Sequence, residues 1–136
     1  MRIVLDTRPL LKLFKGEKNA DVVKDILELI ENSRIEGFVN AITLTEIYYI
    51  YSRIDKKIAE ERVNQIKQSI KIVPIEENIA IQAGVFKGQY KIPIADSLIA
   101  ASAYLLNAVV ISDDPDFKKI KGITVMDEST FLNKWS

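Results

Sequence analysis

The sequence of 136 residues contains no cysteine and no histidine, and it has few glycines and prolines, with Gly 5 and Pro 4. The lack of cysteine excludes disulfide bonds, thiolate nucleophiles, cysteine-based zinc sites and iron–sulfur clusters. The lack of histidine excludes Ser–His–Asp and Cys–His catalytic groups and most catalytic zinc sites. Chemistry in this chain therefore has to come from carboxylates, hydroxyls, amines or a metal ion bound by oxygen atoms.

Neither sign of charge is in excess, because Lys+Arg 19 balance Asp+Glu 19 and the formal net charge is +0. A neutral chain lacks the overall basic surface through which many proteins bind nucleic acid. Basic residues are nevertheless concentrated in two segments, and each segment is either a nucleic-acid contact or an ordinary solvent-exposed face. The residues are Arg8, Lys12, Lys15 and Lys18 in the first segment and Lys118, Lys119 and Lys121 in the second.

Long hydrophobic runs are also missing, since the most apolar stretches, residues 42–51 and 99–111, fall short of the about 20 residues of a membrane span. The N-terminus lacks the apolar core of a signal peptide, so we expect a cytoplasmic protein with no membrane partner. A hydrophobic content of 48% predicts a well-packed core. No linker or repeat divides the chain, and we expect one domain over residues 1–136.

Strand and helix patterns alternate along the chain. Short β-branched runs predict strands near residues 3–5, 37–39, 70–73, 108–111 and 123–125. A first helix is predicted directly after Thr7. Further helical patterns cover residues 22–30, 43–51, 55–69, 76–89, 95–106 and 129–135, and a turn or short helix is expected at 113–119. Thr7 is expected to cap the first helix and Thr43 to open the helix after the second strand. This alternation predicts an α/β fold of three layers (α/β/α) with a parallel sheet of about five strands.

Acidic residues lie where the predicted strands end or the following helices begin. In open α/β sheets, ligands bind beyond the carboxyl ends of the strands, so acids at this edge indicate a functional site. The residues are Asp6, Glu46, Asp96, Asp113, Asp114 and Asp116.

Each acid also has a purely structural explanation. Thr43 and Glu46 fit a capping box, in which the glutamate only reaches back to the start of its helix. Asp96 can stabilise its helix through the helix dipole, which contributes roughly 0.3–1 kcal/mol. Asp6 can cap the first helix, and the acids around Pro115 can form a solvated turn. Taken one at a time, these positions leave both explanations open.

Taken together, the acids would repel one another. Two carboxylates about 4 Å apart repel by roughly 4 kcal/mol at an effective dielectric constant of about 20. Such a cluster needs protons or a bridging cation to be stable. An all-oxygen site of this kind suits Mg²⁺ or Mn²⁺.

Four segments, in this order, resemble the motifs of the PIN-domain ribonucleases, and in length the chain resembles the VapC-type toxins. The segments are residues 3–7, 44–47, 94–103 and 109–117. The resemblance covers essentially the whole chain and implies a PIN-like domain that hydrolyses RNA phosphodiester bonds with a divalent metal ion. It also implies a homodimer and a cognate antitoxin protein.

The resemblance assigns roles to individual residues. It implies a catalytic set made of Asp6, Glu46, Asp96 and Asp114, in which the three aspartates bind Mg²⁺ or Mn²⁺ and the glutamate acts as ligand or base. Supporting positions fall on Thr7, Ser112 and Asp116.

One position departs from the family's pattern, because Arg8 stands where a small polar residue is common. Its guanidinium group is suited to binding phosphate. Arg8, Lys12 and Lys118 are therefore the candidates for contacts with the RNA backbone.

Three other functions compete with a toxin ribonuclease. An RNA-processing nuclease of the same family would share the site, and a PIN-like scaffold for RNA or protein would lack catalysis. A phosphoacceptor receiver domain also places aspartates at strand ends, but Glu46 and Asp96 on helices fit it poorly. Tyr48, Tyr49 and Tyr51 are expected to serve packing or dimer contacts.

Overall fold

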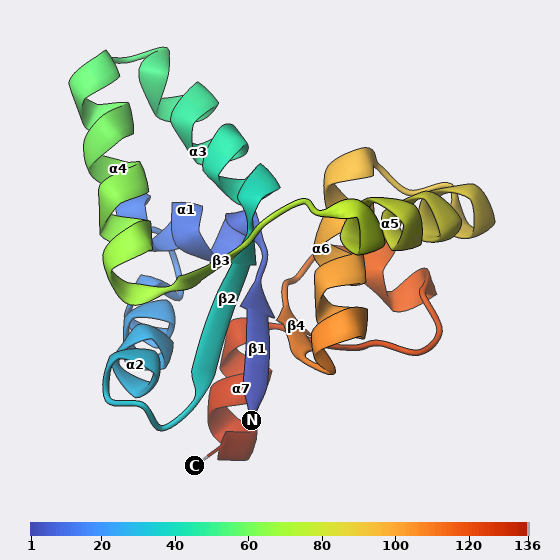
Figure 1. The fold of residues 1–136 in the computed structure, drawn as a ribbon. Helices are drawn as coiled ribbons and strands as arrows, with labels where there is room; N and C mark the ends of the chain where they lie inside the picture. The colour runs from blue at the N-terminus through green and yellow to red at the C-terminus, as the bar shows by residue number, and fades with distance from the viewer. Residues whose placement is uncertain (136) are drawn as a thin grey trace.

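The computed structural model describes residues 1–135 and contains one five-stranded sheet in the order β3-β2-β1-β4-β5 (Figure 1). All four strand pairs are parallel. The chain leaves the central strand β1 toward β2 on one side and later returns to its other side with β4, so the topology reverses beside β1. The strands are β1 (Arg2–Leu5), β2 (Glu36–Asn40), β3 (Lys71–Val73), β4 (Val109–Ile111) and β5 (Thr124–Met126).

Helices cover both faces of the sheet, which confirms the predicted three-layer α/β fold (Figure 1). None of the described helices is long and apolar enough to cross a membrane. The helices are α1 (Thr7–Lys15), α2 (Ala20–Glu31), α3 (Ala41–Ser52), α4 (Lys56–Ser69), α5 (Glu77–Tyr90), α6 (Ile94–Leu106), the 3₁₀ helix η1 (Pro115–Lys119) and α7 (Glu128–Trp135).

The central strand is buried on both faces. Val4 packs in the core under α5 and α6, whereas Ile3 and Leu5 pack in the core under α1, α2 and α7. All three side chains are 0% exposed. This alternation leaves the carboxyl end of β1, next to Ile111 of β4, as the place where polar side chains can gather.

Two helices are capped by residues other than Thr7 and Thr43, which the sequence predicts to begin them. Asp6, not Thr7, caps α1, because its carboxylate accepts a 2.8 Å hydrogen bond from the Thr7 amide. Helix α3 begins at Ala41, and Asn40 caps it by accepting a 2.8 Å hydrogen bond from the Ile42 amide. The prediction that Thr43 opens this helix was wrong, and so was the capping box built on it. The side chains of Thr43 and Glu46 are therefore available for other contacts.

The three tyrosines of α3 have different environments. Tyr51 is buried in the core at 6% exposure and packs edge-on against Phe14, with ring centroids 6.0 Å apart. Tyr48 and Tyr49 are 36% and 61% exposed. Packing therefore accounts for Tyr51, and dimer contacts by the other two stay a prediction.

Candidate metal centre

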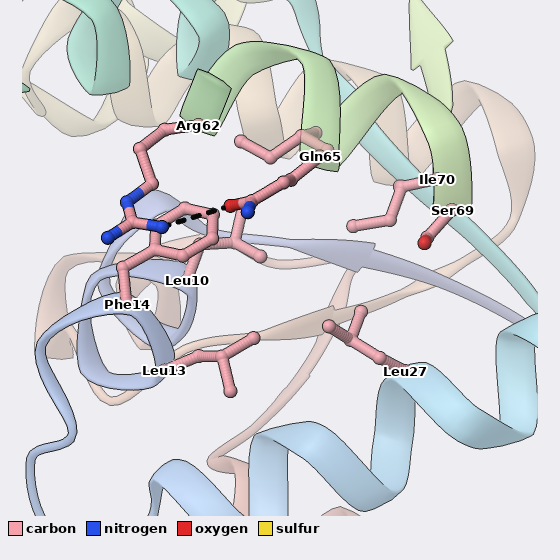
Figure 2. A pocket seen from close by; sticks show the side chains of 9 residues that line it. Leu10, Leu13, Phe14, Leu27, Arg62, Gln65, Ser69 and Ile70 are labelled. Atoms are coloured by element: carbon pink, nitrogen blue, oxygen red, sulfur yellow. Dashed lines mark hydrogen bonds between the residues drawn. The ribbon is translucent and has the colours of Figure 1, made fainter. Parts of the chain in front are cut away.

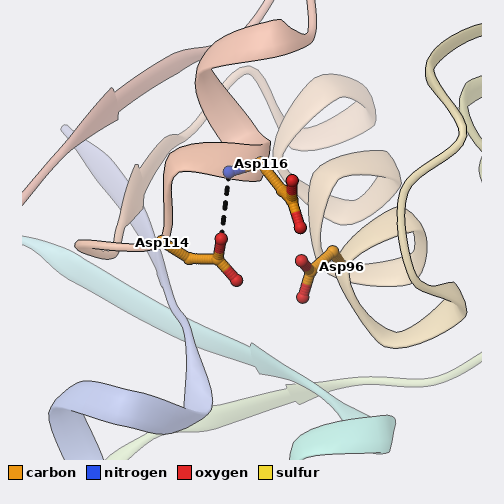
Figure 3. Close-up of side chains that lie close together, drawn as sticks. All are labelled: Asp96, Asp114 and Asp116. Carbon is orange, nitrogen blue, oxygen red and sulfur yellow. Dashed lines mark hydrogen bonds between the residues drawn. The ribbon is translucent and has the colours of Figure 1, made fainter.

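Three aspartates beyond the carboxyl ends of the strands lie close enough to share one cation. Asp96, Asp114 and Asp116 each offer a carboxylate oxygen, and these atoms lie within 4.8 Å of one another. Asp96 is in the first turn of α6, Asp114 caps η1, and Asp116 is in the first turn of η1. Figure 3 shows their carboxylates around one common space, with α6 on one side and η1 on the other.

The short segment between β4 and η1 is shaped by its own hydrogen bonds. Ser112 Oγ accepts a 3.0 Å hydrogen bond from the Asp114 amide, and Asp114 Oδ1 accepts a 2.9 Å hydrogen bond from the Asp116 amide. Pro115 suits the first position of η1, because that position needs no amide donor. These local bonds fix the carboxylate of Asp114, and the carboxylate of Asp116 is held by Lys119, whose Nζ lies 2.7 Å from Asp116 Oδ1.

Asp6 brings a further carboxylate to this edge of the sheet. It is only 4% exposed, and its Oδ2 accepts a 2.6 Å hydrogen bond from Ser112 Oγ. Burial raises the pKa of Asp6 despite the lowering effect of its hydrogen bonds from Ser112 and Thr7, and the neighbouring Glu46 and Asp114 carboxylates raise it further. The charges that raise this pKa belong to the predicted site residues.

Asp96 is the acid of the group whose negative charge is least offset by hydrogen bonds or opposite charges. Burial raises the pKa of Asp96 to about 7, and the carboxylates of Asp114 and Asp6 add to the effect. The side chain is 8% exposed, and within residues 1–135 its Oδ2 has no hydrogen-bond partner. A buried oxygen without a partner, beside other carboxylates, fits a divalent cation, which prefers oxygen ligands and offsets the repulsion.

Glu46 reaches this region from α3 through a hydroxyl group. Thr7 Oγ1 donates a 2.6 Å hydrogen bond to Glu46 Oε1 and lies 3.2 Å from Thr43 Oγ1. The predicted acids therefore come together in two parts. Asp96 and Asp114 share the compact group with Asp116, which the sequence suggested only as a supporting residue, while Asp6 and Glu46 lie outside that group.

The basic residues near the site are engaged in ion pairs. Arg8 Nε lies 2.6 Å from Asp113 Oδ1, and Lys12 Nζ lies 2.9 Å from Asp113 Oδ2 and 2.6 Å from Glu128 Oε1. The Arg8 guanidinium holds the pKa of Asp113 below its usual value. Lys118, by contrast, is an exposed residue of η1.

Sequence reasoning missed the structural roles of Asn40 and Glu128. Asn40 is fully buried, and its Nδ2 donates a 2.8 Å hydrogen bond to Ser102 Oγ, which ties the end of β2 to α6. Glu128 is 1% exposed at the start of α7. An asparagine between a strand and a helix was the available signal for Asn40. Nothing adjacent in the sequence indicates that Glu128 is buried.

An apolar pocket of about 330 Å³ lies away from the acidic group, with lining residues from α1, α2 and α4 (Figure 2). Arg62 is its main charged residue. The Arg62 guanidinium stacks over the Phe14 ring at 5.0 Å and donates a 3.2 Å hydrogen bond to Gln65. The predicted site residues do not line this pocket.

Comparison with known proteins gives one family match. The model of the PIN domain family matches residues 3–123, which include all the predicted site residues. Among curated proteins, no sequence matches the chain.

Solved structures with a similar fold include three from toxin systems. VapBC2 from Rickettsia felis, bound to a promoter DNA fragment, has a TM-score of 0.78 and 20% identity over 93% of this chain and 98% of that chain. A toxin–antitoxin complex from Klebsiella pneumoniae has a TM-score of 0.72 and 24% identity over 93% of this chain and 97% of that chain. VapC20 from Mycobacterium tuberculosis, which cleaves the sarcin–ricin loop, has a TM-score of 0.68 and 12% identity over 90% and 97%. At identities this low, the TM-scores establish a shared fold alone.

Proposed function

The chain belongs to the PIN-domain family, and on this premise we propose that it is a ribonuclease that hydrolyses RNA phosphodiester bonds with Mg²⁺ or Mn²⁺. The observation that carries the proposal is the group of Asp96, Asp114 and Asp116, whose carboxylate oxygens lie within 4.8 Å of one another. We further propose that the protein is the toxin of a toxin–antitoxin pair.

The metal ion would be held by Asp96 and Asp114, with Asp116 and Asp6 completing the oxygen ligands. A divalent ion in such a site supplies an activated water for attack on phosphorus and offsets the charge that develops on the phosphate. The pKa of Asp96, about 7, supports this assignment, because a cation is the partner that its buried carboxylate lacks.

Glu46 is the candidate base or additional ligand. The hydrogen bond from Thr7 Oγ1, 2.6 Å long, orients one carboxylate oxygen and leaves the other for water or metal. Thr7 in turn belongs to the first turn of α1, directly after Asp6. Thr7 therefore couples the orientation of Glu46 to the end of β1.

Arg8, Lys12 and Lys118 are proposed to bind the RNA backbone. The side chain of Arg8 is 60% exposed beside the acidic centre, so a phosphate can reach it. Lys12 is 17% exposed and already shared by two carboxylates, which makes it the weaker candidate. Phosphate contacts of this kind would let a neutral chain bind RNA locally.

The proposed partners are RNA, an antitoxin protein and a second copy of the chain. Similarity to the toxin–antitoxin complex from Klebsiella pneumoniae supports the antitoxin. We also propose that residues 1–136 form a single PIN-like domain that acts in the cytoplasm without a membrane partner.

The decisive experiment is incubation of the protein with total RNA, with and without Mg²⁺ or Mn²⁺, followed by mapping of the cleaved ends. Asp96→Asn is the control, and it should abolish cleavage while the far-UV circular dichroism stays unchanged. Equal cleavage by this variant would refute the assignment of the site. Growth arrest on expression in a bacterial host would separate a toxin from a processing nuclease.

A further inference from the structure

Helix α7 begins with a buried glutamate that the proposed reaction does not use. Glu128 is 1% exposed, and its Oε1 accepts a 2.6 Å hydrogen bond from Lys12 Nζ. Its Oε2 has no hydrogen-bond partner within the part of the chain that the structure describes. Because a buried carboxylate is costly without an opposite charge, Lys12 is the residue that keeps Glu128 in place.

Lys12 also contacts the turn that carries the candidate metal ligands. The same Nζ donates a 2.9 Å hydrogen bond to Asp113 Oδ2, while Arg8 Nε donates a 2.6 Å hydrogen bond to Asp113 Oδ1. Burial alone would lower the pKa of Lys12, but its hydrogen bonds to Glu128 and Asp113 outweigh this effect and raise it. Lys12 therefore remains a charged link between α7 and the turn.

Three successive residues of this turn are each held by hydrogen bonds. Ser112 Oγ donates to Asp6 Oδ2 at 2.6 Å, and Asp113 is held by Arg8 and Lys12. The Asp114 amide donates to Ser112 Oγ at 3.0 Å. The turn is thus held by Asp6 at the end of β1 and by Arg8 and Lys12 of α1, whose positive charges are paired with the Asp113 carboxylate.

Stability alone is a weak explanation for the buried pair of Lys12 and Glu128. Apolar residues of similar volume often replace a buried ion pair with no loss of stability. What apolar residues cannot supply is the hydrogen bond from Lys12 to the Asp113 carboxylate. What distinguishes this ion pair is therefore that it holds the turn in a defined position.

We propose that Glu128 is a positioning residue, which acts through Lys12 and Asp113 to hold the turn between β4 and η1 so that Asp114 and Asp116 face Asp96 before a metal ion binds. This inference rests on the proposed function, since it concerns the same acidic centre. Glu128 itself lies outside the compact group of metal-ligand candidates.

The test is the double variant Lys12→Met/Glu128→Leu, which removes the ion pair and retains bulk. Isothermal titration calorimetry without RNA measures its affinity for Mn²⁺, and amide hydrogen exchange measures the protection of Asp114 and Asp116 in the metal-free protein. We expect the thermal midpoint to stay near that of the wild type, the affinity for Mn²⁺ to fall about 10- to 100-fold, and both amides to exchange faster.

The control is the double variant Lys71→Met/Glu36→Leu, which changes the same residue types in a 3.1 Å ion pair at the amino-terminal ends of β2 and β3. It should leave the affinity for Mn²⁺ unchanged. If the first double variant does not fold, Glu128→Gln retains shape while removing the charge, and we expect it to weaken Mn²⁺ binding about three- to tenfold.

The outcomes separate the two proposals. If the wild type binds Mn²⁺ and the folded variants bind it equally well, with Asp114 and Asp116 equally protected, Glu128 contributes only to stability and the positioning role is overturned. If the wild type itself binds no Mn²⁺, the proposed function fails, and the role of Glu128 fails with it.

Discussion

Thr7 Oγ1 donates a 2.6 Å hydrogen bond to Glu46 Oε1, and this contact joins the first turn of α1 to the second turn of α3. Thr7 directly follows Asp6, whose carboxylate accepts a hydrogen bond from the Thr7 amide. The orientation of Glu46 is therefore linked through one residue to the aspartate at the end of the central strand.

We predict that Thr7→Val lowers kcat for RNA cleavage about 10- to 100-fold with little change in KM. Valine keeps the shape of threonine but cannot donate a hydrogen bond to Glu46, so the carboxylate loses its orientation. Steady-state kinetics on a short RNA that the protein cleaves would measure the effect. Thr45→Val, on the exposed side of α3, is the matched control and should retain wild-type kcat. Wild-type kcat in Thr7→Val would contradict a role for this contact.

The sheet and three of its acids could be predicted because their signals are local. Uninterrupted β-branched runs are typical of buried parallel strands, and Asp6 and Asp114 lie within three residues of where such runs end. Asp96 stands out as a charge in the first turn of an otherwise apolar helix. The fold class therefore followed from patterns that span no more than 15 consecutive residues each.

The remaining contacts could not be predicted because their partners are distant in the sequence. Glu46 pairs with Thr7 39 positions away, and Glu128 pairs with Lys12 116 positions away. The start of α3 was misplaced for a local reason, since Asn40 ends β2 and caps the helix at once, and the strand pattern concealed the cap. Only the packed fold excludes the capping box for Glu46, and its role in the site stays a prediction.

The pKa of Asp96 predicts how the metal-free protein responds to Asp96→Asn. The folded state retains the Asp96 proton up to a pKa of about 7, whereas the unfolded chain loses it near 3.8. The stability of the wild type therefore falls as the pH rises between these values, because the folded state binds more protons than the unfolded state. At pH 8, the variant should be more stable than the wild type by about 1–2 kcal/mol, or roughly 3–10 °C in thermal midpoint.

Urea unfolding in EDTA at pH 5 and pH 8 would test this difference. At pH 5 the unfolded chain has already lost the Asp96 proton while the folded state retains it, so part of the difference between the two proteins should be present and it should be clearly smaller than at pH 8. Asp127→Asn is the control of opposite sign, because the hydrogen bond from the Thr130 amide lowers the pKa of Asp127. That variant should lose stability at pH 8. A less stable Asp96→Asn protein at pH 8 would contradict the prediction, because it would show that other groups stabilise the ionised Asp96 carboxylate in the folded state.

The same pKa predicts that Mn²⁺ binding depends on pH near neutrality although the chain has no histidine. Binding requires the ionised carboxylate, so protons compete with the metal below pH 7. We expect the affinity for Mn²⁺ to fall about tenfold from pH 8 to pH 6, with about one proton released per ion at pH 6. Calorimetry in two buffers of different ionisation enthalpy would count the protons. Constant affinity over this range would contradict ligation by Asp96, and EDTA should abolish RNA cleavage at any pH.

The proposed role of Arg8 in RNA binding can be tested separately from metal chemistry. Its side chain is 60% exposed and its guanidinium is paired with Asp113, so an RNA phosphate has to compete with that carboxylate. Arg8→Ala should weaken RNA binding and reduce the dependence of log Kd on log salt by about one unit of slope, because one phosphate contact is lost.

Fluorescence anisotropy with a labelled single-stranded RNA, measured without divalent metal at several salt concentrations, would test this prediction. Asp113→Asn removes the competing charge and should tighten RNA binding at low salt, provided that Arg8 is present. The double variant Arg8→Ala/Asp113→Asn should then bind no more tightly than Arg8→Ala. If Asp113→Asn tightens binding equally in both backgrounds, general repulsion of RNA by the acidic centre explains the effect, and Arg8 is not a phosphate contact.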